Sequence, residues 1–244
     1  MDFPEVLRLT DDRLAAFQTA VAAAPSLAAP VPTCPGWTLS DLIRHLGLGR
    51  REWAAIVAAG PAATPPPEPV WTAPADPAAW LAESHRLLQD ALLAAGPDGG
   101  CWTWWETSES PPTSGAVARH QLQEVAVHTY DAQMTAGTPQ PLPDAVALDG
   151  VDEFLATCCT GAHGWPHGPV TLDYRAVEGR AWRLSLTAGG VTLDRSPAGP
   201  ATATARGTAS DLVLALYCRI PMTALTLEGD AHQFDVLIEW DPDE

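Results

Sequence analysis

The stretch GAVARHQLQEVAVHTYDAQMTAG, residues 115–137, decides the fold of the first half of the chain. Apolar residues recur in it at near-helical spacing, and Gly137 and Pro139 end the pattern. The stretch therefore predicts a single helix. One edge of that helix carries His120, Glu124 and His128, each four residues from the next, so all three lie on roughly the same face.

Imidazole and carboxylate groups on one helix face are typical ligands of Zn²⁺ and similar divalent metals. Neighbours four residues apart are separated by ~6 Å along the helix axis, so two of them can bind one ion. His120 and His128 are ~12 Å apart by the same arithmetic, too far for ligand bonds of about 2.0–2.2 Å to one metal. The helix thus offers one pair, either Glu124 with His128 or His120 with Glu124, and a third ligand must come from elsewhere. The alternative is a solvated polar edge with two ordinary histidines.

Three further amphipathic helices are predicted before this one, over residues 4–24, 39–59 and 78–95. Residues 61–78 are rich in proline and predict an extended loop. Four helices with short or proline-rich connections indicate a bundle, in which metal sites form from inward-facing residues of different helices. His45 lies between the apolar positions Leu42 and Leu46; such a histidine is more often a core residue, but it supplies the third ligand if a metal pair faces it. His85, in the third helix, is expected at the surface.

Residues 101–115, CWTWWETSESPPTSG, place three tryptophans within four positions. They predict a loop packed over the open end of the bundle, or a wall of a substrate pocket, and the two interpretations are compatible. Arg219 follows the apolar residues of a predicted helix over 208–221, where a guanidinium complements the C-terminal end of the helix dipole.

After Pro143 the pattern changes from helices to alternating strands. Residues 147–160 predict one more helix, and three segments at 168–176, 181–189 and 190–197 predict an antiparallel meander. A further short strand is expected at 201–209, and the chain ends in a strand, a turn and a helix or strand. We therefore predict an α+β protein of two domains, a four-helix bundle over residues 1–143 and a small α+β domain with an antiparallel sheet over residues 144–244.

The composition excludes several classes of function. Acidic residues outnumber basic ones by 30 to 13, which leaves a net charge of −17, so neither nucleic acid nor an anionic membrane is an expected partner. The N-terminus lacks the basic and apolar segments of a signal peptide, and the apolar runs are too short to span a bilayer. The expected location is cytoplasmic, with five free cysteine thiols.

The chain resembles the mycothiol-dependent maleylpyruvate isomerase family of actinobacteria, in which a DinB-like helical bundle precedes a sterol-carrier-like α+β domain. Four segments carry the resemblance: VPTCPGWTLSDLIRHLG at 31–47, ARHQLQEVAVHTYDAQ at 118–133, GTASDLVLALYCRIP at 207–221 and LTLEGD at 225–230. The resemblance implies a divalent metal, usually zinc, held by His45, Glu124 and His128. It also implies mycothiol as a thiol cofactor, and Arg219 as the residue that faces the metal and helps to bind an anionic substrate. Where the family pattern leads us to expect glycine before this arginine, the chain has Cys218.

The predicted chemistry follows from the metal and the thiol. A thiol that coordinates a metal loses its proton, and the thiolate is a nucleophile at neutral pH. Addition to an activated double bond allows rotation about it and gives an isomerase, whereas attack on a carbon with a leaving group gives a thiol S-transferase. We expect Trp37 and Trp104 to contribute to the cofactor site, and the protein to be a monomer or homodimer acting on a small molecule. The alternatives are a metal-dependent hydrolase on the same bundle, or a non-catalytic module that binds an apolar ligand among Trp37, Trp102, Trp104 and Trp105.

Overall fold

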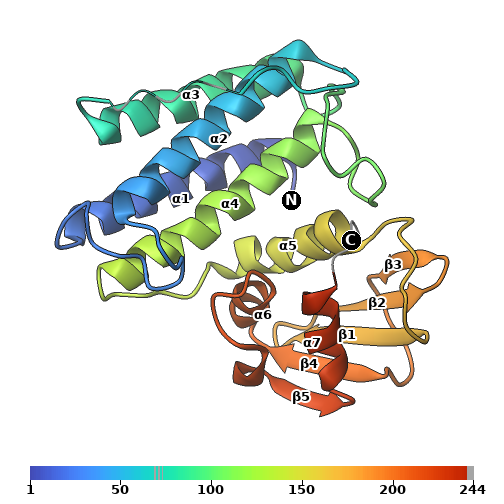
Figure 1. Ribbon diagram of the computed structural model, residues 1–244. Coiled ribbons are helices and arrows are strands. Elements are labelled where there is room, and N and C mark those ends of the chain that lie inside the picture. Colours follow the sequence, from blue (N-terminus) through green and yellow to red (C-terminus); the bar gives the residue numbers. More distant parts are fainter. Residues whose placement is uncertain (69, 71, 73, 241–244) are drawn as a thin grey trace. The chain divides into compact units, whose positions relative to one another are not determined.

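The computed structural model describes residues 1–68, 70, 72 and 74–240. Within them the chain forms two compact units (Figure 1). The first unit comprises Met1–Trp104 and Pro112–Pro141, and the second comprises Trp105–Pro111 and Leu142–Glu244. The two units are described separately below.

The first unit is a four-helix bundle, as the hydrophobic spacing predicted. Its helices are α1 (Phe3–Ala23), α2 (Leu39–Ala59), α3 (Pro77–Ala95) and α4 (Ser114–Thr135). Helix α1 packs against α4, and α2 packs against both α3 and α4 (Figure 1). Within 61–76 the described residues form no helix or strand, in agreement with the predicted loop; residues 69, 71 and 73 of that loop lie outside the described part.

The core of the bundle consists of aliphatic side chains and one phenylalanine contributed by all four helices. Helix α2 begins with a capping box, in which Thr38 accepts from the backbone N–H of Asp41 and Asp41 accepts from that of Thr38. The reciprocal bonds fix where α2 starts and therefore which of its residues face α4. His85 is 8% exposed and pairs with Asp11 of α1, so its predicted surface position was wrong.

The second unit is an α+β domain built on a five-stranded sheet. Helix α5 (Asp144–Phe154) continues into a π-helical turn (Leu155–Cys159), and the strands β1 (Val170–Ala176), β2 (Ala181–Thr187), β3 (Gly190–Asp194) and β4 (Ala203–Gly207) follow. The unit continues with α6 (Ala209–Leu216), a 3₁₀ turn (Met222–Ala224), β5 (Thr226–Gly229) and α7 (His232–Glu239). The sheet order is β3-β2-β1-β4-β5.

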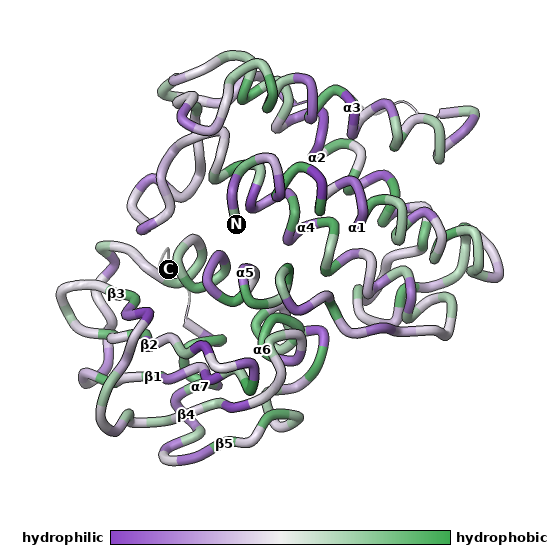
Figure 2. The backbone as a smooth tube through the Cα atoms, turned by 180° about the vertical axis from the view of Figure 1, so that it is seen from behind, coloured by the Kyte–Doolittle hydropathy of each residue, from purple (hydrophilic) through white to green (hydrophobic). Residues whose placement is uncertain are grey.

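The meander β1-β2-β3 is antiparallel as predicted, but β4 pairs in parallel with β1. Hydrophilic and hydrophobic residues are interspersed along the strands (Figure 2). Because successive side chains of a strand point to opposite sides, the sheet has two different faces. One face is apolar and is covered by helices: Tyr174 of β1 contacts Phe234 of α7, and Trp182 of β2 donates to Asp152 of α5. The opposite face carries polar side chains, among them Asp173, Arg175, Arg183, Thr204, Arg206 and Glu228.

Candidate functional site

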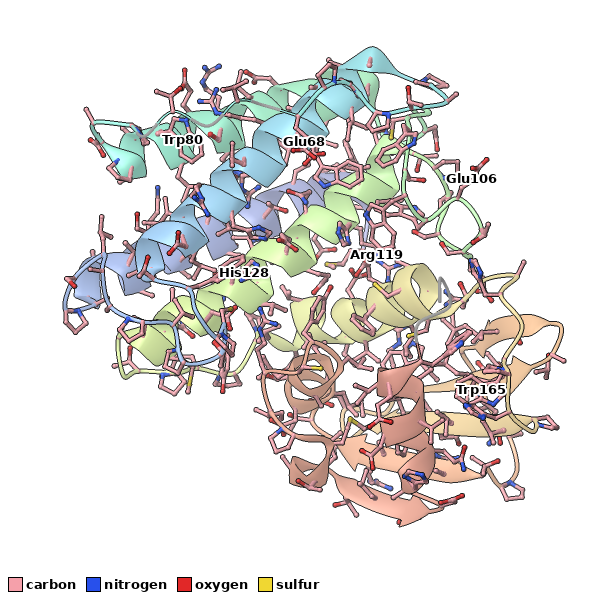
Figure 3. The ribbon with its side chains drawn as sticks, in the orientation of Figure 1. Glu68, Trp80, Glu106, Arg119, His128 and Trp165 are labelled. Atoms are coloured by element: carbon pink, nitrogen blue, oxygen red, sulfur yellow. The ribbon has the colours of Figure 1, made fainter. Side chains whose placement is uncertain are left out.

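The candidate site lies within the first unit, between α2 and α4. His45 comes from α2, and Glu124 and His128 come from α4 one turn apart (Figure 3 labels His128). His45 Nε2 lies 2.6 Å from Glu124 Oε1, and His128 Nε2 lies 3.3 Å from the same oxygen. One ligand atom from each of the three residues falls within 4.8 Å of the others. Two imidazole nitrogens and a carboxylate at this separation fit the donor set of Zn²⁺ or a similar ion.

The three side chains differ in their access to solvent. The His45 side chain is 42% exposed, that of Glu124 24%, and that of His128 8%. A metal bound among them would therefore be open on the His45 side. An open position is what distinguishes catalytic from structural zinc sites.

A second group of side chains supports His128 from the opposite side of its ring. His128 Nδ1 lies 2.8 Å from Asp131 Oδ2, and Asp131 is fully buried. Asp131 also accepts from Thr33 Oγ1 at 2.6 Å and from Cys34 Sγ at 3.4 Å. An Nδ1–H bond to a buried carboxylate holds the ring in place and directs Nε2 toward Glu124.

Cys34, His128 and Asp131 form a second set of converging donors, which shares His128 with the first set. The loop that supplies Cys34 is closed by backbone bonds from Val31 N to Trp37 O and from Trp37 N to Cys34 O. Gly36 has φ of +84° within this turn, a conformation that favours glycine. The same loop brings Trp37 against His45 and His128, with ring centroids 5.0 and 6.4 Å away.

The charges of the site are strongly coupled. Burial opposes ionisation of Glu124, but hydrogen bonds from His128 and His45 outweigh it and hold its pKa well below the usual value. Burial likewise disfavours the charged form of His128, but bonds to Asp131, Cys34 and Glu124 raise its pKa well above the usual value. Without a metal, both shifts favour an imidazolium beside a carboxylate.

Comparisons with known proteins agree with this architecture. The family profile described as "Mycothiol maleylpyruvate isomerase N-terminal domain" matches residues 7–133, and the "MDMPI C-terminal domain" matches residues 145–235. The chain belongs to the mycothiol maleylpyruvate isomerase family.

One solved structure of this family shares the fold. A histidine-to-alanine mutant of the mycothiol-dependent maleylpyruvate isomerase matches with a TM-score of 0.53 at 12% identity, over 93% of each chain. The mycothiol-dependent maleylpyruvate isomerase itself matches with a TM-score of 0.48 at 13% identity, over 88% of this chain and 89% of that one. No curated protein matches the chain.

The other residues predicted for the site fall in different places. The structure does not group His120 with His45, Glu124 and His128; its ring contacts Trp53 and Trp104. Trp104 is 51% exposed, and its ring lies 5.8 Å from that of His120. Trp37, by contrast, lies beside His45 and His128. No helix among the described residues is long and apolar enough to cross a membrane.

Arg219 belongs to the second unit and follows the C-terminal end of α6. Its backbone N–H bonds to Leu214 O and that of Cys218 to Ala215 O, which is the Schellman pattern of helix termination. Cys218 has φ of +59°, so the position where family resemblance led us to expect glycine is left-handed in this chain. The predicted helix over 208–221 is correspondingly shorter and ends at Leu216.

Sequence reasoning missed three residues that contribute to the environment of the site. Thr33 and Cys34 contact Asp131 from a loop about a hundred residues earlier, and no local spacing signals such a contact. Arg50, one turn beyond the predicted ligand on α2, is fully buried, and its charge interacts with those of Glu124 and Asp11. The available signal was the spacing of Arg50, which lies four residues after Leu46 and three before Trp53, on the apolar side of α2.

Proposed function

We propose that this protein is a metal- and mycothiol-dependent enzyme that isomerises a small anionic substrate by adding a thiolate to an activated double bond. The observation that carries the proposal is the convergence of His45, Glu124 and His128, two imidazoles and a carboxylate from two helices, on one point at the edge of the bundle. Family membership supports the thiol and the reaction class.

The donor set fits a divalent metal, and we propose His45 Nε2, a Glu124 oxygen and His128 Nε2 as its ligands. When bound, such an ion supplies a Lewis acid that favours the ionised form of a thiol. Asp131 accepts from His128 Nδ1 and so keeps the ring oriented with Nε2 toward the ion. Trp37 lies beside both imidazoles, with ring centroids 5.0 Å from His45 and 6.4 Å from His128.

Arg219 is the proposed partner of the substrate's anionic group. The chain has few cations and a large negative charge, so an anionic substrate needs a specific guanidinium as well as the metal. The side chain of Arg219 is partly exposed beyond α6, and its Nη1 donates to Tyr217 O at 2.8 Å. Arg219→Ala should leave the metal content unchanged and cut turnover of a carboxylate substrate, and Arg219→Lys should restore it only partly.

The test combines metal analysis with an activity assay. Purified protein, loaded with zinc, should contain about one metal per chain and should convert maleylpyruvate only when mycothiol is added, as followed by ultraviolet absorbance. Glu124→Gln should lose both the metal and the activity. Full metal content with no thiol-dependent turnover of any unsaturated acid would refute the isomerase proposal and favour hydrolysis or S-transfer at the same site.

A further inference from the structure

The polar face of the sheet in the second unit contains a cavity of about 320 Å³. Its walls come from three adjacent strands, β1, β4 and β5, and from the loop that precedes β4. The lining residues are Arg175, Pro200, Ala201, Thr204, Arg206, Glu228 and Gly229. The volume lies at the lower end of the range for small-molecule sites.

The register of the strands places two arginines side by side in this cavity. Arg175 of β1 and Arg206 of β4 are direct partners in the parallel ladder, so their side chains leave the same face of the sheet. Like charges on directly opposed strand positions are destabilising. A nearby anion would offset the repulsion between Arg175 and Arg206.

One buried carboxylate on this face of the sheet is already shared. Asp173 is fully buried and accepts from Arg183 Nε at 2.6 Å and from Arg175 Nη2 at 2.7 Å. Arg183 also donates to the carbonyl oxygens of Ala198 and Gly199, which fixes the loop that forms one wall. One carboxylate thus serves two guanidinium groups, and positive charge remains.

Arg206 carries that remaining charge. Its side chain is exposed, and it has neither a hydrogen bond nor an ion pair with any residue of the described chain. Glu228 lies across the ladder from Thr204 rather than from Arg206. The guanidinium groups of Arg206 and Arg175 therefore both border the cavity, one without a partner and one partly neutralised.

The rim of the cavity depends on a glycine. Gly229 has φ of +76°, and a Cβ at this position would lie 2.4 Å from the carbonyl oxygen of Thr202. Only glycine allows β5 to approach the loop before β4 this closely. Gly229 is one of the residues that line the cavity.

We propose that this cavity is a binding site for a small oxyanion, a phosphate or carboxylate group held between Arg206 and Arg175 with Thr204 as a further donor. Two guanidinium groups and a hydroxyl are the donors that recognise such groups. Glu228 accepts hydrogen bonds only, so it opposes binding of a bare anion. The site is independent of the metal site proposed above and of its chemistry.

The experiment is an NMR titration of the full ¹⁵N-labelled chain with sodium phosphate. A parallel titration uses sodium acetate, and sodium chloride at equal ionic strength is the reference for both. We expect saturable amide shifts around residues 200–206 and 228–229 below about 10 mM, an affinity typical of a weak ion site. A response to phosphate alone identifies a phosphate site, and a response to both identifies a general oxyanion site. Absence of a saturable response in both arms would overturn the proposal.

Two substitutions in the cavity should change the affinity for the anion in opposite directions. Arg206→Gln should weaken binding about tenfold or more, since a charge-assisted bond is lost, and Glu228→Gln should tighten it. Arg8→Gln at an exposed position and Glu5→Gln at a half-buried position of α1 remove the same charges in the first unit and serve as controls. Unchanged affinity in Arg206→Gln, or equal effects in the control pair, would assign the response to general electrostatics and overturn the site.

Discussion

His45 Nε2 lies 2.6 Å from Glu124 Oε1, although the two residues are 79 positions apart in the chain. The distance means that α2 and α4 present their polar residues to each other at one level of the bundle. His128 reaches the same oxygen from one turn further along α4. The first prediction concerns what these three residues hold together.

Removing any of the three proposed ligands should remove the metal. His45→Ala, Glu124→Ala and His128→Ala should each lower the zinc content, measured by mass spectrometry of dialysed protein, well below one per chain. His120→Ala is the matched control, because His120 contacts Trp53 and Trp104 instead of the triad, and it should keep its metal. Full occupancy in Glu124→Ala would show that the ion binds elsewhere.

Asp131 should set the metal affinity without touching the metal. Its carboxylate accepts from His128 Nδ1 at 2.8 Å, and Asp131→Asn weakens that bond. We expect zinc affinity, measured by competition with a chelator, to fall ~10–100-fold. Thr33→Val removes only a bond to the same carboxylate and should have a smaller effect. Equal affinities in Asp131→Asn and the native protein would leave Asp131 a purely structural role.

Metal binding should release a proton from His128. Burial alone would lower the pKa of His128, but its bonds to Asp131, Cys34 and Glu124 raise it well above the usual value, so the ring is charged near neutral pH in the absence of metal. A metal on Nε2 must displace that proton. Calorimetry at pH 7 in buffers of different ionisation enthalpy should therefore report release, declining as the pH rises through the raised pKa. Asp131→Asn removes one cause of the shift and should release less at pH 7.

Arg50 should destabilise the metal-free fold. It is fully buried, none of its guanidinium nitrogens has a hydrogen-bond partner among the described residues, and burial lowers its pKa to about 10 despite the charges of Glu124 and Asp11. A lowered pKa means that the cation is less stable in the folded than in the unfolded chain at neutral pH. Arg50→Met should thus raise the free energy of unfolding in urea by up to about 3 kcal/mol.

The control for that substitution is Arg50→Lys, which keeps a buried charge and should give no such gain. The gain in Arg50→Met should be constant up to about pH 10 and should shrink only at higher pH, because above about 10 the arginine loses its charge in the folded state while the unfolded chain keeps it. A less stable Met variant at pH 7 would mean that Glu124 or Asp11 depends on the guanidinium more than burial penalises it.

Cys218→Gly should stabilise the second unit. Cys218 holds φ of +59° in the Schellman turn after α6, a conformation that costs a side chain about 1–2 kcal/mol and glycine little. We expect a gain of about 1 kcal/mol in thermal or urea unfolding, offset in part by the greater freedom of glycine in the unfolded chain. Cys158→Gly is the control, because Cys158 is an exposed cysteine of the π-helical turn. This substitution should give no gain in stability.

The features that the sequence predicts well are local. Helices α1 to α4 follow from apolar spacing, and the Glu124–His128 pair follows from a separation of four residues. The contacts that sequence reasoning missed join distant segments: His85 is buried because Asp11, 74 positions earlier, meets it. The parallel pairing of β4 with β1 depends on tertiary packing and not on local sequence. The alternation of residues 201–209 is equally compatible with an antiparallel neighbour. The metal ligands and the role of Arg219 remain predictions.

Residues 105–111 leave the bundle and join the second unit before the chain returns to form α4. Glu109 attaches this segment to the second unit, because its carboxylate accepts a hydrogen bond from Leu193 N and pairs with Arg195. The polypeptide therefore passes between the two units three times, and no single cleavage separates them. A fragment ending at residue 143 would contain the whole metal-site sequence but would expose Trp105, which is 3% exposed in the intact chain. Biochemical dissection of this protein is thus better done by point substitution than by truncation.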